Sequence, residues 1–576
     1  MNIRSDDLAF LLFDWLKIAG DQDDYTSILA SAERLGAELL ANHAAKSDAN
    51  EPKLVDGQVV LIPEIKRALD ALADAGFFAI GAASEDGGLG LPQTIVTACL
   101  AVFSAHNAPT YAYTMLTVAA ANLLAIHGSP ALKERYLKPM LAGKYFGTMC
   151  LSETHAGSSV GDISTVADPH ADGSYRLRGS KMWISGGEHS MAENICHFVL
   201  AKIPGGPAGT RGISLFLVPR LHDDGSRNGI AVAGVNHKMG YRGTVNCLLN
   251  LGEHTPCVGY LVGQPHGGIR AMFTMMNEAR IGVGAGAAAM GYAGFRAALA
   301  YAQERKQGRL PNAEPQSPPV AIIAHADVRR MLMQAKVYAE GALALCLYAS
   351  QLLDEESAGD AEAGRVLALL TPIVKAWPSD FGLKANDLAI QVLAGAGYTR
   401  DFPLERLWRD NRLNAIHEGT NGIQGLDLLG RKVIADQGAG LKLLARRVQS
   451  TVARAAHDQE LSPLAGELAN AIQDIARVSE PLILRAAFNE MEIALANASH
   501  YLDALGHVVV AWLWLDQALT AKSLRDADSR GRDGLLDGKI LACRYFFRWE
   551  LPCIRYKLEL IGKPDIIVLE VNGSVL

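Results

Sequence analysis

The chain has 576 residues, of which 49% are hydrophobic and 20% are charged, and its formal net charge is −7 at pH 7. This length exceeds what one hydrophobic core usually organises, so we expect a globular protein of several domains. The acidic balance gives no basic surface of the kind that binds nucleic acid, which argues against a nucleic-acid partner.

The cysteine spacing and the apolar runs indicate where in the cell the protein is expected. Eight cysteines are scattered through the chain without a Cys-x-x-Cys pair. This pattern indicates reduced thiols rather than a disulfide framework or a zinc site, so we expect no metal and a cytoplasmic location. Residues 1–7 lack the basic stretch and apolar core of a signal peptide. The apolar run at residues 508–515 is too short to cross a membrane, so we expect no membrane span.

The first block, residues 1–144, has the periodicity of helices. Apolar residues recur at three- and four-residue spacing in residues 25–40 and 63–75, as on the buried face of a helix. Between them, Asp56-Gly57 precedes Gln-Val-Val-Leu-Ile, which indicates a short strand or an extended arm. We therefore expect an N-terminal helical domain.

From residue 145 the period changes to that of short strands. The segments concerned are apolar or alternate between apolar and polar residues, and Gly, Pro, Asp and Asn punctuate them. They are residues 146–151, 175–184, 195–203, 213–219 and 258–262. We therefore expect a central β domain over residues 145–267, inserted between helical blocks.

After residue 268 the helical period returns and lasts nearly to the C-terminus. The run Gly282-Val-Gly-Ala-Gly-Ala-Ala-Ala-Met-Gly291 loosely fits a dinucleotide fingerprint, but no strand precedes it, so we set a Rossmann domain aside. Its small residues indicate instead two helices in close approach. We expect a helical bundle over residues 268–440 and an additional helical domain over residues 441–576. The strongest helical stretches of this last domain are residues 461–484, 491–505 and 508–524. The predicted fold class is α+β, mainly α.

The segment Ile416-His-Glu-Gly-Thr-Asn-Gly-Ile-Gln424 carries a candidate acid–base residue. Gly419 and Gly422 free the backbone to turn tightly, so we expect Glu418 to be presented from a loop between two helical segments. A carboxylate beside apolar walls loses hydration, which raises its pKa and makes it a usable base near neutral pH. A solvated glutamate in a surface turn has the same local pattern, so both interpretations stay open at this point.

Two motifs lie in the predicted β domain. Met149-Cys-Leu-Ser-Glu-Thr-His-Ala-Gly-Ser-Ser159 ends a strand in small hydroxyl and glycine residues, which can contact a flat polar ring or a pyrophosphate; an ordinary turn is the alternative. In the second motif, Trp183 and Ser185 lie on one face of a strand, as an aromatic wall beside a hydroxyl. Simple core packing of the tryptophan would give the same pattern.

These motifs resemble, in type and order, those of the flavin-dependent acyl-CoA dehydrogenase family. Four more segments, residues 236–244, 276–280, 303–309 and 391–398, match the family between them, so the resemblance covers residues 149–424. The chain length and the C-terminal block are similar to those of the longer bacterial branch. That branch includes enzymes for fatty acyl-CoA and for 3-methylmercaptopropionyl-CoA. The resemblance implies FAD as the cofactor and an acyl-CoA as the substrate.

The resemblance also implies roles for individual residues. In the family, a tryptophan lies against the flavin ring and a nearby hydroxyl bonds its N5 atom, and Trp183 and Ser185 match these positions. Arg305 matches a residue that reaches the FAD pyrophosphate of a neighbouring subunit, as a guanidinium suits phosphate. The implied FAD-binding residues are Met149, Leu151, Ser152, Gly157, Ser158, Trp183, Ser185, Arg305, Gln391, Gly395, Thr420 and Gly422. The implied substrate-binding residues are Ser158, Asn277, Arg280 and Gly419.

Glu418 matches the catalytic base of the family. It would take the α-proton of the acyl-CoA while the β-hydrogen leaves as hydride to the flavin, which yields a trans-2-enoyl-CoA. The backbone N–H of the same residue would bind the thioester oxygen. Electrons would then pass to an electron-transferring flavoprotein. A homodimer is implied, because in longer members the C-terminal block covers the site where a second dimer docks in shorter, tetrameric members.

Several positions depart from the family pattern, and they concern fine contacts. The departures are Ser159 for Asp, Gly308-Arg309 for Phe-Gly, Ala394 for Gly, His417 for Tyr, and Gly422 for Gln or Glu. Two other activities stay open. A DNA-binding flavoprotein similar to the alkylation-response branch would need a basic C-terminal face, whereas residues 458–492 carry mixed charge. A flavin oxidase would use oxygen directly and release peroxide. Acyl length and branching do not follow from residue types alone.

Overall fold

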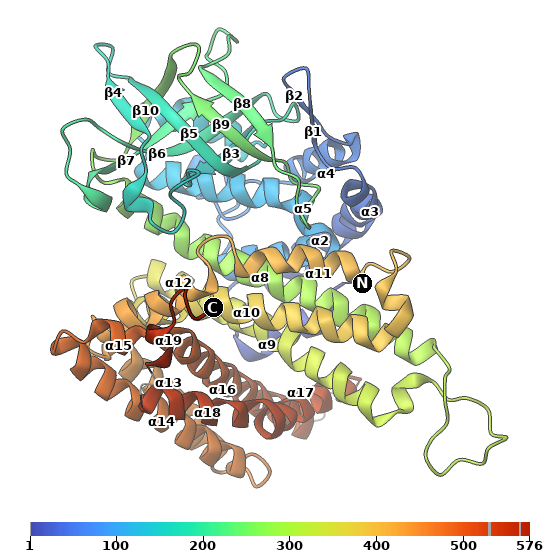
Figure 1. The fold of residues 1–576 in the computed structure, drawn as a ribbon. Coiled ribbons are helices and arrows are strands. Elements are labelled where there is room, and N and C mark those ends of the chain that lie inside the picture. Colours follow the sequence, from blue (N-terminus) through green and yellow to red (C-terminus); the bar gives the residue numbers. More distant parts are fainter. Residues whose placement is uncertain (1, 528–530, 564–565) are drawn as a thin grey trace. The chain divides into compact units, whose positions relative to one another are not determined.

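The computed structural model describes residues 2–527, 531–563 and 566–576, with side chains for all of these except residues 273–277 (Figure 1). Its internal contacts divide the chain into two units. The β unit is Leu29–Gly282, and the helical unit combines Met1–Ile28 with Val283–Leu576. The divisions fall inside helices α2 (Gln22–Leu35) and α8 (Gly268–Glu304). Most of the N-terminal helical block therefore shares a unit with the strands.

Helices form the first part of the β unit, as the periodicity predicts. They are α3 (Ala41–Ala49), α4 (Pro63–Asp74), α5 (Gln93–His127), α6 (Pro130–Leu132) and α7 (Lys138–Leu141). A hairpin of β1 (Lys53–Val55) and β2 (Gln58–Val60) interrupts them. Its turn residues, Asp56 and Gly57, both have positive φ, which is the conformation that an Asp-Gly hairpin turn requires. The expected short strand is confirmed.

Within the described residues, the β unit contains an eight-stranded sheet in the order β10-β7-β6-β4-β5-β9-β8, with β3 parallel to β6. Because β10 pairs with both β7 and β5, five of the strands close into a ring. The strands are β3 (Tyr145–Cys150), β4 (Val166–Pro169), β5 (Tyr175–Ser185), β6 (Asn194–Lys202), β7 (Ile213–Pro219), β8 (Ile230–Val235), β9 (Asn246–Leu251) and β10 (Cys257–Val262). Helix α5 lies against the sheet (Figure 1), and its Leu124 shares a core with Phe198 and Leu215.

Five of these strands match segments predicted from the sequence, and β4, β8 and β9 were not predicted. The reason is local composition. Strand β4 is short and ends in Pro169, β8 has no fully buried position, and β9 contains Asn246 and Asn250, which resemble turn residues. Their strand conformation comes from pairing with neighbours rather than from an apolar pattern.

The rest of the chain folds into the helical unit. Its helices are α1 (Ser5–Ala9), α9 (Ala326–Ser357), α10 (Ala361–Leu393), α11 (Leu404–Arg412), α12 (Asn421–Leu426), α13 (Ala439–Ala455), α14 (Ser462–Ala487), α15 (Met491–Leu495), α16 (Ala498–Asp526), α17 (Asp533–Tyr545), α18 (Ile554–Gly562) and α19 (Ile567–Glu570), together with the later part of α8. The predicted helices at 491–505 and 508–524 are wrong in their division, since α15 ends at Leu495 and α16 runs unbroken through residues 505–508.

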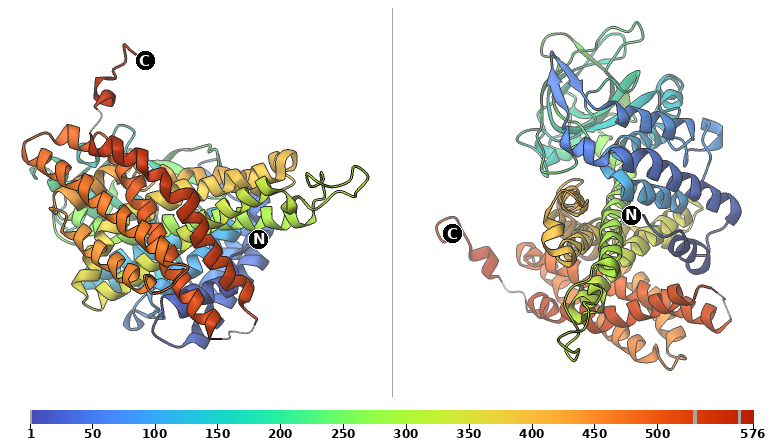
Figure 2. Two further views of the ribbon diagram at one scale, coloured as in Figure 1. Left: turned by 90° about the horizontal axis from the view of Figure 1, so that it is seen from below. Right: turned by 90° about the vertical axis from the view of Figure 1, so that its right-hand side faces the viewer.

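Helix α16 packs against α14, α17 and α18, which lie with it in the orange-to-red C-terminal part of the chain in Figure 2. By length and composition alone this helix, which contains the apolar run at residues 508–515, could cross a membrane. However, 83% of its most apolar 18-residue window is buried inside the protein. The helix therefore has the environment of a core helix of the C-terminal domain.

The glycine-rich run of α8 packs closely on α10, as the sequence predicts. A Cβ atom at Gly284 would lie 2.1 Å from the carbonyl oxygen of Val374, and one at Gly291 would lie 2.9 Å from the Cα atom of Gly382. Pro378 lacks the N–H that would normally bond the Val374 carbonyl, so this oxygen loses its regular donor four residues later in the helix. Glycine at 284 allows the neighbouring helix to cover that exposed carbonyl.

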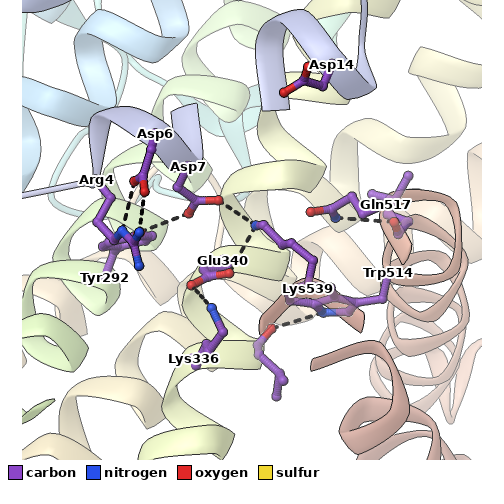
Figure 3. Close-up of polar contacts among 12 residues, drawn as sticks. Arg4, Asp6, Asp7, Asp14, Tyr292, Lys336, Glu340, Trp514, Gln517 and Lys539 are labelled. Carbon is purple, nitrogen blue, oxygen red and sulfur yellow. Dashed lines mark hydrogen bonds and ion pairs between the residues drawn. The ribbon is translucent and has the colours of Figure 1, made fainter. Parts of the chain in front are cut away.

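A buried ion cluster joins the first helix of the helical unit to its last domain (Figure 3). The Nζ atom of Lys539, on α17, is 2.6 Å from Asp7 Oδ1 on α1 and 3.0 Å from Glu340 Oε2 on α9. Tyr292 donates its hydroxyl hydrogen to Asp7 Oδ2 at 2.9 Å, and Lys336 pairs with Glu340. These contacts hold residues from four helices together.

Candidate active site

A buried ion pair between Glu153 and Lys181 holds the loop that follows β3. Glu153 accepts hydrogen bonds from the backbone and hydroxyl groups of Ser164 and Thr165, and Lys181 Nζ lies 2.9 Å from it. Burial alone would raise the pKa of Glu153, but Lys181 and these donors lower it to about 2. Lys181 also donates to the Leu151 carbonyl at 3.1 Å, so β5 holds the loop in place.

An exposed tryptophan lies beside this loop. The pairing of β5 with β9 shifts register between Lys181 and Ile184, and Trp183 sits in this bulge with φ +66° and with 60% of its surface exposed. The neighbouring N–H of Met182 donates to the Ser152 carbonyl at 2.9 Å, so the backbone of Ser152 lies beside the residue that precedes Trp183. A positive φ at a non-glycine residue costs about 1–2 kcal/mol, and such strain is typical of functional positions.

The other predicted flavin residues of the β unit lie on β3, on the loop after it and at the end of β5. Ser185 Oγ accepts a hydrogen bond from Asn246 at 3.2 Å, which leaves its own hydrogen to be donated to another group. Gly157 and Ser158 are exposed, and a Cβ atom at Gly157 would meet nothing within 4 Å. Met149 and Leu151 are partly buried against the core. The structure therefore brings Ser152, Trp183 and Ser185 together at the ends of β3 and β5.

In the helical unit, Glu418 occupies a tight turn between Leu413–Ala415, a 3-10 helix, and α12. Glu418 and Gly419 have φ +51° and +84°, and Gln424 Nε2 donates to both of their carbonyls, at 3.1 and 3.2 Å. Thr420 caps α12 by accepting from the Ile423 N–H. The expected loop between two helical segments is confirmed.

The prediction that Gly422 helps to form this turn is wrong. Gly422 is the second residue of α12 and has ordinary helical φ, so it does not form the turn. The left-handed positions are Glu418 and Gly419 instead. A Cβ atom at Gly419 would lie 2.7 Å from the amide nitrogen of Gln424, so glycine is required there both for φ and for space. Gly422 is exposed with open space around it.

A ladder of amides holds His417, the residue before Glu418. Asn386 Nδ2 donates to the Met290 carbonyl, Asn411 Nδ2 donates to Asn386 Oδ1, and Asn414 Nδ2 donates to Asn411 Oδ1, at 2.8, 2.7 and 2.9 Å. Asn414 Oδ1 is thus left to accept from His417 Nε2 at 3.0 Å, which assigns the proton to Nε2. Burial, and to a smaller degree Lys375, lowers the pKa of His417 to about 3, so this imidazole is neutral at pH 7.

The residues predicted to face a neighbouring subunit are exposed at helix ends. Gln391 lies in the last turn of α10, and Gly395 follows in a turn where Ala394 has φ +50°. Ala394 thus adopts the conformation for which the family pattern has glycine. Tyr398 in this turn is 90% exposed, and Arg305, just after α8, is exposed as well.

The predicted CoA residues lie on α8. Arg280 is buried with 5% of its surface exposed, and the side chain of Asn277 lies outside the described residues. Sequence reasoning assigned no role to Glu153, Lys181, Gln424 or Lys375, although each contacts a predicted site segment. A charged or amide residue within an apolar element was the available signal.

Solved structures share this fold. ACDH-11 of Caenorhabditis elegans, solved in complex with C11-CoA, matches with a TM-score of 0.80 over 99% of this chain and 94% of its own, at 19% identity. An acyl-CoA dehydrogenase from Bacillus anthracis, complexed with FAD, matches with a TM-score of 0.77 over 98% and 93%, at 18% identity. The fold is that of a flavoprotein dehydrogenase with an added C-terminal helical domain.

Sequence comparison identifies the family. Models for the N-terminal, middle and C-terminal domains of acyl-CoA dehydrogenase match residues 22–144, 148–252 and 266–434, and an acetyl-CoA dehydrogenase C-terminal-like model matches residues 444–572. A 3-methylmercaptopropionyl-CoA dehydrogenase of Ruegeria pomeroyi is 33% identical over 87% of this chain and 86% of its own length. The broad-specificity linear acyl-CoA dehydrogenase FadE5 of Mycobacterium tuberculosis is 32% identical over 96% and 94%. The chain belongs to the acyl-CoA dehydrogenase family and is an FAD-dependent oxidoreductase.

Proposed function

We propose that this acyl-CoA dehydrogenase converts a saturated acyl-CoA to its trans-2-enoyl-CoA with Glu418 as the base. The observation that supports this role is the Glu418–Gly419 turn, in which two consecutive positive φ angles are held by Gln424. A strained conformation at a non-glycine carboxylate is maintained only where the surroundings fix it, and such positions are typical of active sites. The Glu418 carboxylate accepts the proton from the α-carbon of the thioester. Its backbone N–H donates to the thioester oxygen, which lowers the cost of the developing negative charge.

The residues of the β unit fit a flavin. An exposed tryptophan in a strained bulge, a serine beside it with a hydrogen to donate, and an open glycine-serine loop offer a flat apolar face, a polar partner and room for a pyrophosphate. Trp183 would lie against the ring, Ser152 and Ser185 would bond its edge, and Gly157 and Ser158 would contact the pyrophosphate. Bound FAD supplies the acceptor for the β-hydrogen, which leaves with its electron pair.

The partners follow from family membership and from the exposed helix ends. We propose a homodimer in which Arg305, Gln391 and Gly395 approach the neighbouring chain. Gln391, Gly395 and Tyr398 leave a polar and aromatic surface uncovered at the end of α10, and Arg305 is exposed just after α8. Light scattering should give twice the chain mass, and a tetramer would reject this. We propose an electron-transferring flavoprotein as the electron acceptor, a place in fatty acid β-oxidation, and a cytoplasmic location, where the eight free cysteines would stay reduced.

Anaerobic titration of the yellow protein with acyl-CoAs of graded length tests the activity. Absorbance of the oxidised flavin should fall stoichiometrically with at least one member of the panel, and an enoyl-CoA should be recovered. A flavin that no acyl-CoA bleaches would contradict the assignment. Release of peroxide in air at the full turnover rate would indicate an oxidase instead.

A second candidate substrate is 3-methylmercaptopropionyl-CoA. It rests on the 33% identity to the Ruegeria pomeroyi enzyme of that name. The identity to an enzyme named for linear acyl-CoA is nearly equal, at 32%, so an experiment has to separate the two substrates. Competition between 3-methylmercaptopropionyl-CoA and pentanoyl-CoA, whose acyl chains have similar length, separates the two. A kcat/KM at least tenfold higher for the thioether would favour the second candidate.

A further inference from the structure

A buried lysine lies beneath the turn that carries Glu418. Lys375 belongs to α10 and has none of its surface exposed. It sits between Pro372 and Pro378, two prolines inside the helix, where the regular pattern of backbone hydrogen bonds is interrupted. A lysine this deeply buried is rare, because taking an ammonium group out of water is costly unless oxygen atoms surround it.

The oxygens that Lys375 binds come from the turn. Its Nζ atom donates to the Gly419 carbonyl at 2.7 Å and to Asn421 Oδ1 at 3.1 Å. Asn421 in turn donates its amide to the Ala376 carbonyl at 3.4 Å. Gly419 and Asn421 are therefore both tied to α10, at Lys375 and Ala376.

The Gly419 carbonyl is the point on which these contacts converge. It accepts from Lys375 Nζ and also from Gln424 Nε2, which bonds the Glu418 carbonyl as well. Fixing two consecutive carbonyls fixes the planes of the two peptides that follow Glu418. The positive φ of Glu418 costs about 1–2 kcal/mol, because this residue is not glycine. A charged donor offsets this cost more strongly than a neutral one.

We propose that Lys375 is the positioning residue of the catalytic base. Its ammonium group binds the Gly419 carbonyl and the Asn421 side chain, and it thereby keeps Glu418 in the left-handed conformation from which the carboxylate and the backbone N–H reach the same substrate. Lys375 acts through residue 418 and does not itself contact the reacting atoms. The catalytic part of this inference rests on the proposed function, whereas the mechanical part, that Lys375 holds the turn, does not.

The test compares Lys375→Met with Lys539→Met as a matched control. Both lysines are fully buried in helices of the helical unit, but Lys539 contacts Asp7 and Glu340 rather than the turn. In stopped-flow experiments, the limiting rate of flavin reduction should fall about 10²-fold in Lys375→Met, which is the loss typical of a misplaced reacting group. The FAD content and the substrate Kd of this variant should stay within twofold of wild type. Lys539→Met should lose stability and keep the rate.

Chemical rescue separates positioning from general stability. In Lys375→Ala, propylammonium should raise the limiting rate of flavin reduction at least tenfold. Propanol should leave this rate unchanged, because only the cation replaces the charged donor. Lys375→Gln is the variant to use if the methionine variant does not fold, since it retains a neutral donor. A limiting rate within twofold of wild type in either variant would overturn the proposal.

Hydrogen exchange decides the mechanical part without reference to catalysis. Amides of residues 416–424 should exchange at least tenfold faster in Lys375→Met than in wild type, and at an unchanged rate in Lys539→Met. Equal exchange in this segment for all three proteins would overturn the proposal. If wild-type flavin is not reduced by any acyl-CoA, or if Glu418→Gln reduces it normally, the proposed function fails, and faster exchange would still show that Lys375 holds the turn.

Discussion

Replacing Lys539 should destabilise the protein far more than replacing a surface lysine, because Lys539 is the cation of the buried cluster in Figure 3. Its side chain and that of Asp7 are 0% and 1% exposed, and Glu340 is 3% exposed. Burial raises the pKa of Glu340, but Lys336 and Lys539 outweigh it and lower that pKa, so the carboxylate is charged in the folded state. Lys539→Met leaves Asp7 with no ammonium within salt-bridge distance among the described residues.

The magnitude follows from these contacts. Removing one partner of a buried ion pair costs about 3–5 kcal/mol, because the remaining charge stays buried without compensation. Glu340 keeps Lys336, and Asp7 keeps the hydroxyl of Tyr292, which favours the lower end of this range. The double variant Asp7→Asn/Lys539→Met should recover about 1–3 kcal/mol relative to the single variant, since it neutralises the most isolated carboxylate.

Urea unfolding followed by tryptophan fluorescence measures the effect, with FAD in equal excess throughout. If unfolding is irreversible, the unfolding rate replaces the free energy. The control is Lys522→Met on α16, whose partners Asp458 and Glu460 are 25% and 36% exposed, and it should cost about 1 kcal/mol or less. A free-energy loss for Lys539→Met no larger than that of Lys522→Met would refute the reasoning.

Three further predictions concern the site. Glu418→Gln should slow flavin reduction by about 10²–10⁴-fold with FAD content unchanged, measured by stopped-flow bleaching, because the amide cannot accept the proton; a near wild-type rate would exclude Glu418 as the base. Trp183→Ala should weaken FAD binding about tenfold in equilibrium dialysis, whereas Trp549→Ala, which removes another exposed tryptophan, should not. Glu153, with a pKa of about 2 against 4.5 when unfolded, should contribute about 3 kcal/mol of stability above pH 4.5 that is lost as the pH falls towards 2; acid titration of Glu153→Gln should lack this loss.

Periodicity predicted the order of helices and strands because most elements bury one continuous apolar face. Periodicity failed where pairing with a neighbouring strand or close helix packing, rather than a continuous buried face, determines the conformation. Strand β8 is half-exposed along its length and is held by pairing with β9, and α16 continues through Gly506, at which the sequence indicated a division. A Cβ atom at Gly506 would lie 2.7 Å from Trp377, so this glycine serves close packing rather than a helix end.

The site was predicted in part, and the limit has a physical cause. The position of Glu418 in a turn and the neighbourhood of Ser152 and Trp183 were correct, since short motifs encode local backbone conformation. The bulge that exposes Trp183 depends on how β5 pairs with β9, and no local pattern reports that register. The prediction that Gly422 helps to form the turn was wrong, and Glu418 takes the left-handed conformation beside Gly419 instead, because glycine is the usual residue at positive φ and a glutamate is not.

A buried lysine supports a predicted site segment in each of the two units. Lys181 donates to the Leu151 carbonyl beside Ser152, and Lys375 donates to the Gly419 carbonyl beside Glu418. Each side chain comes from a regular element, a strand in one case and a helix in the other, and each binds an irregular segment by its backbone. The ammonium group gives the loop carbonyl a charged hydrogen-bond donor, and the long lysine side chain allows this donor to come from a neighbouring strand or helix. In the sequence Lys375 is the single charge of an apolar run, residues 366–378, whereas Lys181 follows Arg178, Gly179 and Ser180. The two become recognisable as supports only once the carbonyl opposite each is known.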